Sequence, residues 1–429
     1  MSVMPSPPKA LMSLDDAWAR LREAVQAHVG SAGGVPTEEI DSLEALGRVL
    51  AQVVTSSVDV PPLDNSAMDG YALRFEDLAR TSPEPAWPVS QRIAAGQVGE
   101  VLLSGTCARI FTGAPVPEGA DAVVMQEHTE ALPDGRIRVT QAVLAGQNIR
   151  CRGEDIASGQ TVLMPGLRLQ AASLGVAASA GFARLSVFRR PKVAVLTTGN
   201  ELVMPGQALP PGAIYNSNRH TLRGLVQSTG ALPADLGIVP DGLASTRAAL
   251  RRAAQAHDLI ITSGGVSVGE EDHLRAAVEA EGGLQFWALA IKPGKPFVFG
   301  WIAREDGSPC LYMGLPGNPA ASFVTFLMLV RPVLGVLAGE GWALPRALML
   351  PAAFEWPQAD KRREFVRARL DQAGQVTLYP HQGSGVLTSA AWADGLVDLA
   401  PGQTVTAGDL VRYVSLAECV QPSSTQCQG

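Results

Sequence analysis

The sequence predicts a multidomain protein of mixed class, in which an α/β domain is combined with β-rich domains. The chain has 429 residues, more than one hydrophobic core usually accommodates, so roughly two to four domains are expected. Apolar strand-like runs alternate with helical patterns over residues 190–340, as they do in parallel α/β sheets. Short alternating runs separated by glycine and proline occupy residues 58–155 and 345–429, a texture typical of β domains.

The composition is that of a folded protein without an extensive basic surface. Hydrophobic residues make up 46% of the chain and charged residues 17%, a balance that supports buried cores. The formal charge of −7 gives no electrostatic reason to expect nucleic acid, although a local anion site is compatible with it. Neither an unbroken apolar run of about eighteen residues nor a signal peptide is apparent. We therefore expect a soluble, cytoplasmic protein without a membrane partner.

The cysteines predict neither disulfide nor metal chemistry. They are odd in number, widely spaced and never arranged as Cys-x-x-Cys. The five are Cys107, Cys151, Cys310, Cys419 and Cys427. We expect most of them to be small apolar residues without a catalytic role.

The N-terminal part predicts a helix over residues 14–28, with Ser13 as its N-cap. Its apolar residues form one stripe: Leu14, Ala17, Leu21 and Val25. The Gly/Pro segment 33–36 should end this helix. A second helical stretch is expected to contain Leu43, Leu46 and Leu50. Adjacent prolines at 61 and 62 then exclude further helix.

The next block, residues 58–155, should form a β-rich domain, because alternating runs at 108–111, 122–125 and 136–139 read as short strands. Residues 157–188 look like an apolar linker and helix. They can rejoin the first helices, which makes residues 10–57 and 156–189 one split domain.

The 190–340 block predicts a parallel sheet whose strands end in turns rich in glycine, proline and polar residues. Open α/β sheets bind ligands beyond the carboxyl ends of their strands, so we expect these turns to line one crevice. The four turns lie at residues 197–201, 240–242, 263–269 and 314–319.

The 263–269 turn is a candidate anion site, because glycines let backbone N–H groups approach an anion where a helix begins. It matches neither the Walker nor the Rossmann pattern, and a tight turn remains the alternative. Prolines 293 and 296 flank Lys295 and follow Lys292, so two ammonium groups would be held in place for a phosphate or oxyanion. Solvated surface lysines are the alternative.

Three acidic residues, Glu201, Asp241 and Asp272, fall on these turns. Such a cluster could hold Mg²⁺ against phosphates, although each acid could instead cap a helix. The 62–72 segment places two Asp, an Asn and a Ser in a turn of the β-rich block. Composition leaves open whether this loop is functional or structural.

The 62–72 segment closely resembles a stretch characteristic of the MoeA and gephyrin E-domain family, and further matches follow in the family's order. They lie at 111–117, 152–155, 198–202, 263–269 with Asp272, 291–296, 315–319 and 381–384. The resemblance spans nearly the whole chain. The 190–340 block is also similar to the stand-alone MogA/MoaB fold, which binds molybdopterin.

The resemblance implies four domains: a split helical linker domain (10–57 with 156–189), a β-rich inserted domain (58–155), a MogA-like three-layer α/β domain (190–340) and a C-terminal β-barrel (345–429). It also implies a homodimer, in which the active cleft forms between the α/β domain of one subunit and the insert of the other.

The implied activity is that of a molybdopterin molybdenumtransferase in the last step of molybdenum cofactor biosynthesis. Such an enzyme takes adenylyl-molybdopterin and molybdate, uses Mg²⁺ and releases AMP. A MogA-type adenylyltransferase and molybdoenzyme-maturation proteins would be its partners. The alternatives are a binding or scaffold protein, an adenylyltransferase, and an insertase that prefers tungstate.

Site residues follow from the matching motifs. The expected catalytic residues are Asp69, Thr112, Asp155, Glu201, Asp241, Asp272, Lys292, Pro316 and Pro319. The expected substrate-binding residues are Ser263, Gly264, Gly265, Ser267, Gly269, Lys295, Asn318, Arg367 and Ser384.

Within this set we expect Asp272 and the 264–269 loop to hold the pterin phosphate. The metal would be held by Glu201, Asp241 and Asp272, and Lys292 would neutralise the oxyanion. Arg367 and Ser384 would contact molybdate.

Two positions depart from the family pattern. Asn200 stands where many relatives have Asp, which removes a possible charge beside Glu201. Ala288 stands where some relatives carry a second functional lysine, so Lys295 or another group would have to supply that charge.

Overall fold

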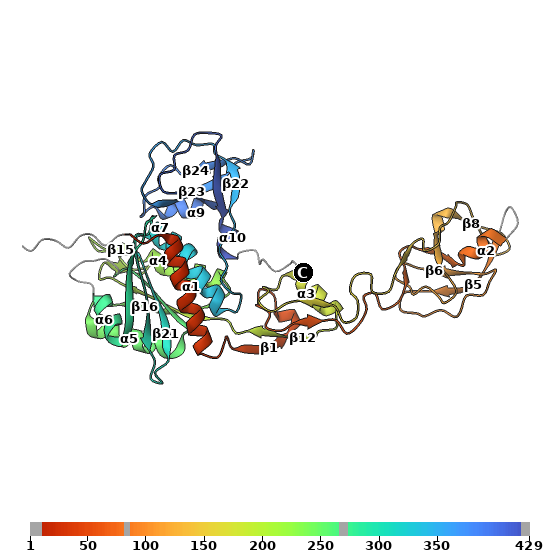
Figure 1. Cartoon of the computed structure of the whole chain (residues 1–429), viewed down its shortest axis with the longest axis horizontal. Coiled ribbons are helices and arrows are strands. Elements are labelled where there is room, and N and C mark those ends of the chain that lie inside the picture. Colours follow the sequence, from red (N-terminus) through yellow and green to blue (C-terminus); the bar gives the residue numbers. More distant parts are fainter. Residues whose placement is uncertain (1–10, 81–85, 266–272, 422–429) are drawn as a thin grey trace, which may run out of the picture.

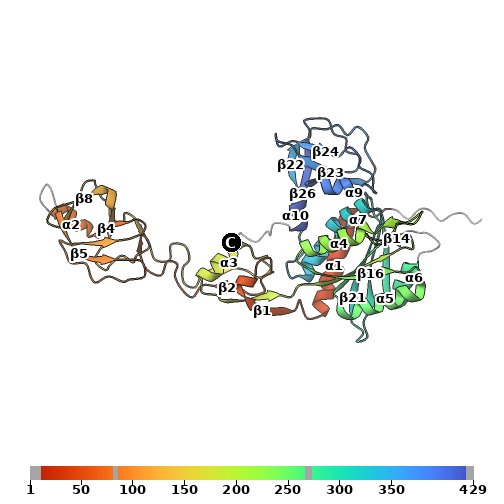
Figure 2. The same cartoon turned by 180° about the vertical axis from the view of Figure 1, so that it is seen from behind.

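The computed structural model describes residues 11–80, 86–265 and 273–421. It confirms the mixed fold class and shows an elongated molecule (Figures 1 and 2). The α/β and C-terminal domains lie together at one end, a small linker unit follows, and the β-rich insert lies at the far end.

Helix α1 (Leu14–Ser31) matches the predicted helix closely. The Ser13 hydroxyl accepts a hydrogen bond from the Asp16 N–H at 3.0 Å, and the four residues of the predicted stripe are the buried ones. The helix packs in the core of the α/β domain, against Val193 and Leu259 among others, and beside α8 (Arg331–Leu337). The predicted linker domain included this segment, so that boundary differs from the structure.

The linker unit is built from two distant pieces of chain. Strand β1 (Thr37–Asp41) pairs antiparallel with β12 (Arg184–Phe188), and β2 (Val54–Thr55) pairs with β11 (Thr161–Leu163). Helix α3 (Ala171–Ser179) packs beside them. Residues from both pieces, including Leu50 and Leu169, share one core.

The predicted second helix is wrong. Only a 3₁₀ turn, Ser42–Glu44, forms there, and the side chains of Leu43 and Leu46 are 87% and 61% exposed. Long-range pairing of β1 with β12 takes precedence over the local spacing of leucines, as tertiary context often overrides helix propensity.

The insert is a small β domain with hydrophobic clusters on both faces of its sheet. The strand order is β7-β4-β6-β5-β9-β8. These strands are β4 (Gly70–Leu73), β5 (Ala86–Ile93), β6 (Cys107–Ile110), β7 (Ala122–Met125), β8 (Thr129–Ala131) and β9 (Arg136–Val139). Also present are α2 (Phe75–Arg80), a 3₁₀ turn (Gln126–His128) and the pair β3 (Asn65–Ser66) with β10 (Ile149–Arg150).

The α/β domain has three layers. Its sheet has the order β16-β13-β17-β21-β20-β18, parallel up to β21 and antiparallel from there. The strands are β13 (Lys192–Thr198), β16 (Leu232–Val239), β17 (Leu259–Ser263), β18 (Gly282–Ala288), β20 (Pro296–Ala303) and β21 (Pro309–Leu315). A short parallel pair, β14 (Leu202–Val203) with β15 (Ile214–Tyr215), lies beside it.

Two hydrophobic clusters, one on each face, fix the layers. Helices α5 (Leu243–Ala256) and α6 (His273–Glu281) contribute to one cluster. Helix α4 (Ser217–Ser228) and α1 contribute to the other. The continuous helix Pro319–Leu337, made of α7 (Pro319–Thr325), a π-helical turn and α8, also belongs there.

The Pro319–Leu337 helix is long and apolar enough to cross a membrane by length and composition, but 94% of its most apolar window is buried inside the molecule. It is the central helix of a folded core, because a helix that is apolar all round is suited to such a place.

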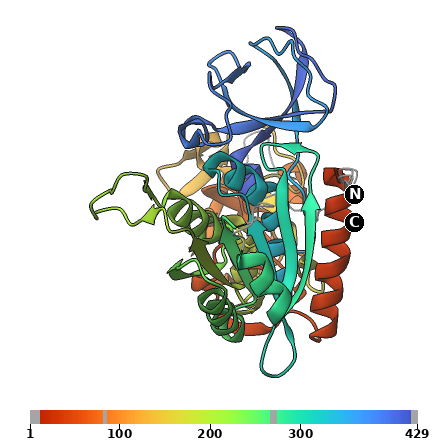
Figure 3. The same ribbon diagram turned by 90° about the vertical axis from the view of Figure 1, so that its left-hand side faces the viewer.

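The C-terminal domain is a curved sheet of the order β19-β23-β25-β26-β22, with β24 on β23. The strands are β19 (Ile291–Lys292), β22 (Leu348–Pro351), β23 (Arg363–Leu370), β24 (Val376–Leu378), β25 (Gly395–Leu399) and β26 (Leu410–Ser415). A bridge between Ala352 and Val376 joins the end of β22 to β24 and closes the sheet, and helices α9 (Leu387–Trp392) and α10 (Leu416–Val420) flank it. Figure 3 shows this domain above the α/β domain.

Strand β19 links the two domains. Its residues leave the α/β domain, yet Ile291 and Lys292 pair in parallel with Arg363 and Glu364 of β23. The loop that carries the predicted lysines is therefore held by both domains.

Candidate functional site

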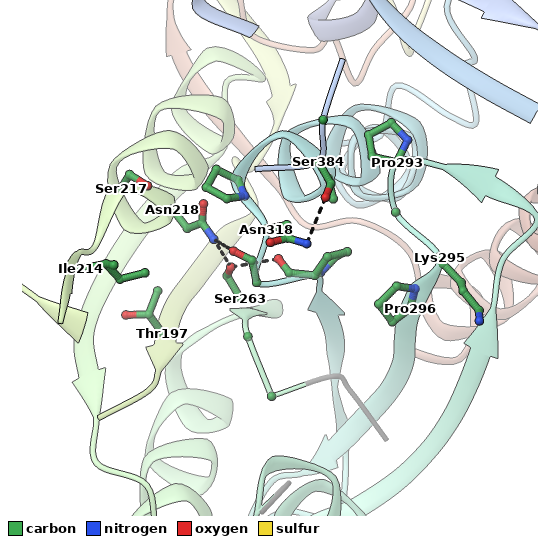
Figure 4. A pocket seen from close by; sticks show the side chains of 18 of the residues that line it. Thr197, Ile214, Ser217, Asn218, Ser263, Pro293, Lys295, Pro296, Asn318 and Ser384 are labelled. Carbon is green, nitrogen blue, oxygen red and sulfur yellow. Dashed lines mark hydrogen bonds between the residues drawn. The ribbon is translucent and has the colours of Figure 1, made fainter. Parts of the chain in front are cut away.

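A cleft with a volume of about 790 Å³ lies between the α/β domain and the C-terminal domain. Figure 4 shows side chains converging on it from the ends of β13, β17 and β21 and from the C-terminal loop that carries Ser384. As predicted from the topology of open sheets, the site sits beyond the carboxyl ends of parallel strands. Three of the four predicted turns supply lining residues, namely those at 197–201, 263–265 and 316–319.

The fourth turn, at 240–242, does not line the cleft. Asp241 lies behind it instead, where its carboxylate accepts a hydrogen bond from the Asn200 N–H at 3.0 Å. The Asn200 side-chain oxygen accepts from the Asp241 N–H in return, at 3.5 Å. Asn200, which stands where many relatives have Asp, therefore still supplies a side-chain oxygen that accepts a hydrogen bond from Asp241. The Asp241 carboxylate in turn holds the turn that bears Glu201.

Asn218, in the first turn of α4, joins two of the strand ends. Its side-chain amide donates to Ser263 Oγ and to the Gly317 carbonyl, both at 2.7 Å, and Ser263 Oγ donates to the Pro316 carbonyl at 3.3 Å. The Asn218 side-chain oxygen has no hydrogen-bond partner among the described residues, so the amide is held through its NH₂ group alone. These bonds tie the start of α4 to the ends of β17 and β21 at the cleft.

A loop of the C-terminal domain closes the start of the central helix. The Ser384 carbonyl accepts hydrogen bonds from the N–H groups of Ala320 and Ala321 at 2.9 and 3.2 Å. The Asn318 side-chain amide donates to Ser384 Oγ at 3.1 Å (Figure 4). Asn318 and Ser384, both predicted to bind substrate, are therefore in contact in the cleft wall.

Arg367 does not line the cleft. Only 1% of it is exposed, and its guanidinium donates to Ser389 Oγ, to the Phe365 carbonyl and, at 3.3 Å, to the Gly383 carbonyl. Burial lowers its pKa to about 10. The predicted direct contact with molybdate is not what the structure shows: Arg367 is a positioning residue for the turn that carries Ser384.

Among the described residues, the charged groups that line the cleft are Lys292, Lys295 and Arg362, with Glu201 as the one carboxylate. The Lys292 ammonium contacts Glu364 at 2.7 Å and Asp360 at 3.4 Å. The hydrogen bond to Glu364 raises the Lys292 pKa, so this lysine stays charged. Arg362 also pairs with Asp360, at 3.0 Å. Lys295 has no ion pair with any residue that the structure describes, so it is the lining cation most available to an anion.

Gly294 is needed where the lysine loop crosses the central helix. Its φ is +114°, and a Cβ built there would lie 2.5 Å from Thr325 Oγ1. Only glycine allows the loop to approach the helix this closely without strain.

Only two of the three residues predicted to bind a divalent metal lie within the described residues. The described residues hold no group of three or more His, Cys, Asp or Glu side chains that could bind an ion. Asp272, together with Ser267 and Gly269, lies outside the described residues. Of the remaining two, Glu201 lines the cleft and Asp241 does not. Glu201 supplies one ligand of the kind that suits Mg²⁺, which in proteins often uses one or two carboxylates together with substrate phosphates and water.

The other predicted catalytic residues lie elsewhere. Asp69 and Thr112 are in the insert, where Asp69 Oδ1 accepts from both the N–H and the hydroxyl of Thr112 at 2.8 Å. These two hydrogen bonds lower the Asp69 pKa. Asp155 is exposed where the chain leaves the insert, and its N–H donates to the Val60 carbonyl at 3.0 Å. Within one chain, the insert that carries Asp69 and Thr112 lies at the opposite end of the molecule from the α/β and C-terminal domains (Figure 1).

Sequence reasoning missed several lining residues, among them Asn218, Arg362 and Tyr215. Asn218 lies at the start of α4, and Arg362 lies in the Lys-Arg-Arg run where β23 begins. Both positions were visible as polar residues at element ends. Their convergence depends on how the two domains pack, which no local pattern encodes.

The buried cysteines have no features of nucleophiles. Cys107, Cys310 and Cys419 are buried, and burial raises the pKa of each thiol to about 12. They remain protonated thiols at neutral pH.

Three family models match the chain: MoeA N-terminal region (domain I and II) over residues 12–181, probable molybdopterin binding domain over 194–335, and MoeA C-terminal region (domain IV) over 349–416. The chain is 37% identical over 408 residues to the molybdopterin molybdenumtransferase of Haemophilus influenzae, an alignment that covers 92% of this chain and 98% of that protein.

Two further relatives agree with these matches. Molybdopterin molybdenumtransferase 2 of Mycobacterium tuberculosis is 39% identical over 368 residues, which cover 83% of this chain and 89% of that protein. The solved structure of the molybdopterin biosynthesis MoeA protein from Pyrococcus horikosii superposes with a TM-score of 0.74 at 30% identity, covering 95% of this chain and 99% of the other.

Proposed function

The chain belongs to the MoeA family, and on this premise we propose that it is a molybdopterin molybdenumtransferase of molybdenum cofactor biosynthesis. In its reaction, molybdenum from molybdate is inserted into adenylyl-molybdopterin and AMP is released. The observation that carries this proposal is the cleft at the carboxyl ends of the parallel strands, whose described lining includes Lys292, Lys295 and Arg362 together with Glu201.

The cleft suits two kinds of oxyanion, a phosphate ester and molybdate. Lys295 has no ion pair within the described residues, so its ammonium is free to receive an anion. Lys292 is charged and held by Glu364, which makes it a fixed rather than a mobile cation. We assign the pterin phosphate to the end of the cleft formed by the 263–265 turn and molybdate to the end that carries Ser384.

The chain's own groups would assist cleavage of the phosphoanhydride by electrostatics and by positioning. Lys292 would neutralise charge that develops on the oxyanion, since preorganised cations act where charge forms. The bonds from Arg367 hold Ser384 toward the cleft without a direct contact. Glu201 and Asp241 would hold Mg²⁺, which when bound offsets the repulsion between anionic groups.

We further propose a homodimer. Asp69, Thr112 and Asp155 cannot reach the cleft of their own chain in this conformation, because the insert lies at the far end of the molecule. A second copy would bring them to a cleft. The linker unit exposes the apolar side chains of Leu43 and Met164, 87% and 50% exposed, which a partner could cover.

The test is molybdate-dependent release of AMP by the purified full-length protein, given adenylyl-molybdopterin and Mg²⁺. Glu201→Gln removes the one lining carboxylate among the described residues and should reduce the rate strongly, while Glu39→Gln, on the exposed face of β1, should not. Tight pterin binding without AMP release would instead favour a binding protein. AMP release that is independent of molybdate would refute the insertion step.

A further inference from the structure

Three residues form a row on one face of the insert sheet, far from the cleft. Arg92 of β5 lies directly opposite Arg109 of β6, and Arg109 lies directly opposite Tyr71 of β4. Phe111 follows two residues after Arg109, on the same side of the chain. The guanidinium carbons of Arg92 and Arg109 lie 4.5 and 4.7 Å from the Phe111 ring centroid, and that of Arg109 lies 5.0 Å from the Tyr71 ring.

This pairing of like charges is unfavourable unless something offsets it. Like charges directly opposite each other on neighbouring strands destabilise a sheet. The ring of Phe111 offsets part of the repulsion through cation–π contacts with both guanidinium groups. The repulsion is also not relieved by a carboxylate bond: Arg109 donates to the Gly70 carbonyl and to the Gln126 side-chain oxygen, at 3.0 and 2.6 Å, which are both neutral.

The insert contains many carboxylates that could have paired with these two arginines. The insert (58–155) has eight arginines and no lysine against fourteen aspartates and glutamates. Exposed Arg92 nevertheless has no hydrogen bond or ion pair among the residues that the structure describes. The charge of Arg109 contributes to lowering the Asp69 pKa, after the two bonds from Thr112, so one carboxylate is near enough to sense it. Among the described residues of this acidic domain, Arg92 therefore has no paired carboxylate.

We propose that Arg92 and Arg109, held by Phe111, form an anion site that takes the phosphate group of a nucleotide. Two guanidinium groups present planar forks of N–H donors that match phosphate oxygens. Because the Phe111 ring restrains both side chains, less rotamer freedom is lost when an anion binds. An anion that bridges the pair also removes the repulsion between them. The choice of a nucleotide rests on the proposed function, in which AMP is a product; the anion site itself does not.

The experiment is calorimetric titration of the full-length protein with AMP and, separately, with inorganic phosphate, at low ionic strength and without molybdate or pterin. Arg92→Gln is the main variant, because Arg92 has no described hydrogen bond whose loss would disturb the fold. Arg136→Gln is the matched control, an exposed arginine of the same domain paired with Asp134. Lys295→Ala reports any binding in the cleft. Circular dichroism checks that each variant is folded.

We expect Arg92→Gln to weaken AMP binding about tenfold, the effect of losing one charge-assisted hydrogen bond, and Arg136→Gln to leave it unchanged. Three outcomes would overturn the proposal: no AMP binding, AMP binding that depends on Lys295 and not on Arg92, or phosphate binding at Arg92 without AMP binding. Since the readout is equilibrium binding without turnover, a protein that binds AMP through Arg92 but releases none from adenylyl-molybdopterin would refute the proposed function and leave this site standing.

Discussion

Replacing Gly294 by alanine should show how strictly the lysine loop depends on its approach to the central helix. The substitution adds one methyl group where φ is +114° and where the nearest atom would be Thr325 Oγ1, at 2.5 Å. Thr325 is fully buried, so it cannot swing away into solvent. The loop must move outward, and Lys292 and Lys295 must move with it.

The expected loss of stability has two parts. The left-handed backbone costs an L-residue about 1–2 kcal/mol, and crowding a packed contact costs typically about 1–3 kcal/mol. Together they predict a destabilisation of about 2–5 kcal/mol, if the two parts add. Displacement of the loop should also raise KM for molybdate, because the cations leave the positions that the cleft requires.

The assay is urea-induced unfolding followed by fluorescence, with molybdate titration of AMP release for the same samples. Gly307→Ala is the matched control: its φ is +82°, and nothing lies within 4 Å of the added Cβ. The loss of stability in Gly307→Ala therefore measures the backbone strain alone, without a steric contact. Combining Gly294→Ala with Thr325→Ala removes the obstructing oxygen and should recover part of the loss, which a double-mutant cycle measures.

Equal destabilisation by Gly294→Ala and Gly307→Ala would refute the steric argument, since only the shared strain would then be present. Failure of Thr325→Ala to recover any stability would locate the contact elsewhere. A destabilised variant with an unchanged KM would show that the lysine positions do not depend on this crossing.

Three further predictions concern charged groups. Lys295→Ala should raise KM for molybdate about tenfold with no change in Tm, and a change in Tm would show that Lys295 has a structural partner. Lys292→Ala should also destabilise, by about 1–3 kcal/mol, because Glu364 is only 4% exposed and loses its ammonium partner; calorimetric unfolding checks this. Glu340→Ala should cost about 3–5 kcal/mol in urea unfolding, because it leaves the guanidinium of Arg331, whose side chain is 1% exposed, without its carboxylate. Burial alone would raise the pKa of Glu340, but its arginine neighbours lower it below 4.5. The stabilisation from this carboxylate is therefore present above pH 4.5 and is lost as the pH falls through the pKa of the folded state. The wild-type protein should show this pH dependence and the variant should not.

Local patterns in the sequence predicted elements well where burial follows a simple period. Helix α1 has the predicted cap at Ser13 and the predicted buried stripe. In an amphipathic helix the apolar residues recur with the helical period, so the buried face can be identified from the sequence. The strands of the α/β domain were visible as apolar runs ending in polar turns for the same reason. The leucines at 43 and 46 have helical spacing but form no helix. They follow strand β1, which pairs with a strand more than 140 residues away along the chain, and only a 3₁₀ turn forms after it.

The candidate site was predictable only in part. The turns at 197–201, 263–265 and 316–319 could be placed in one cleft, since parallel strands end at the same edge of a sheet. The role of Arg367 could not, because a guanidinium that holds a loop and one that binds an anion look alike in sequence. The separation of Asp69 and Thr112 from the cleft could not be predicted either. It depends on how the insert is placed relative to the other domains, which local sequence patterns do not specify.

The sharing of β19 between two domains has a mechanical consequence. If the C-terminal domain swings away from the sheet, the pairing of Lys292 with Glu364 carries this ammonium along. Ser263 and Asn218, which are anchored on the opposite wall, stay behind. Opening the cleft would then pull one cation away from a bound anion, so that release of an anionic product and domain movement become a single event.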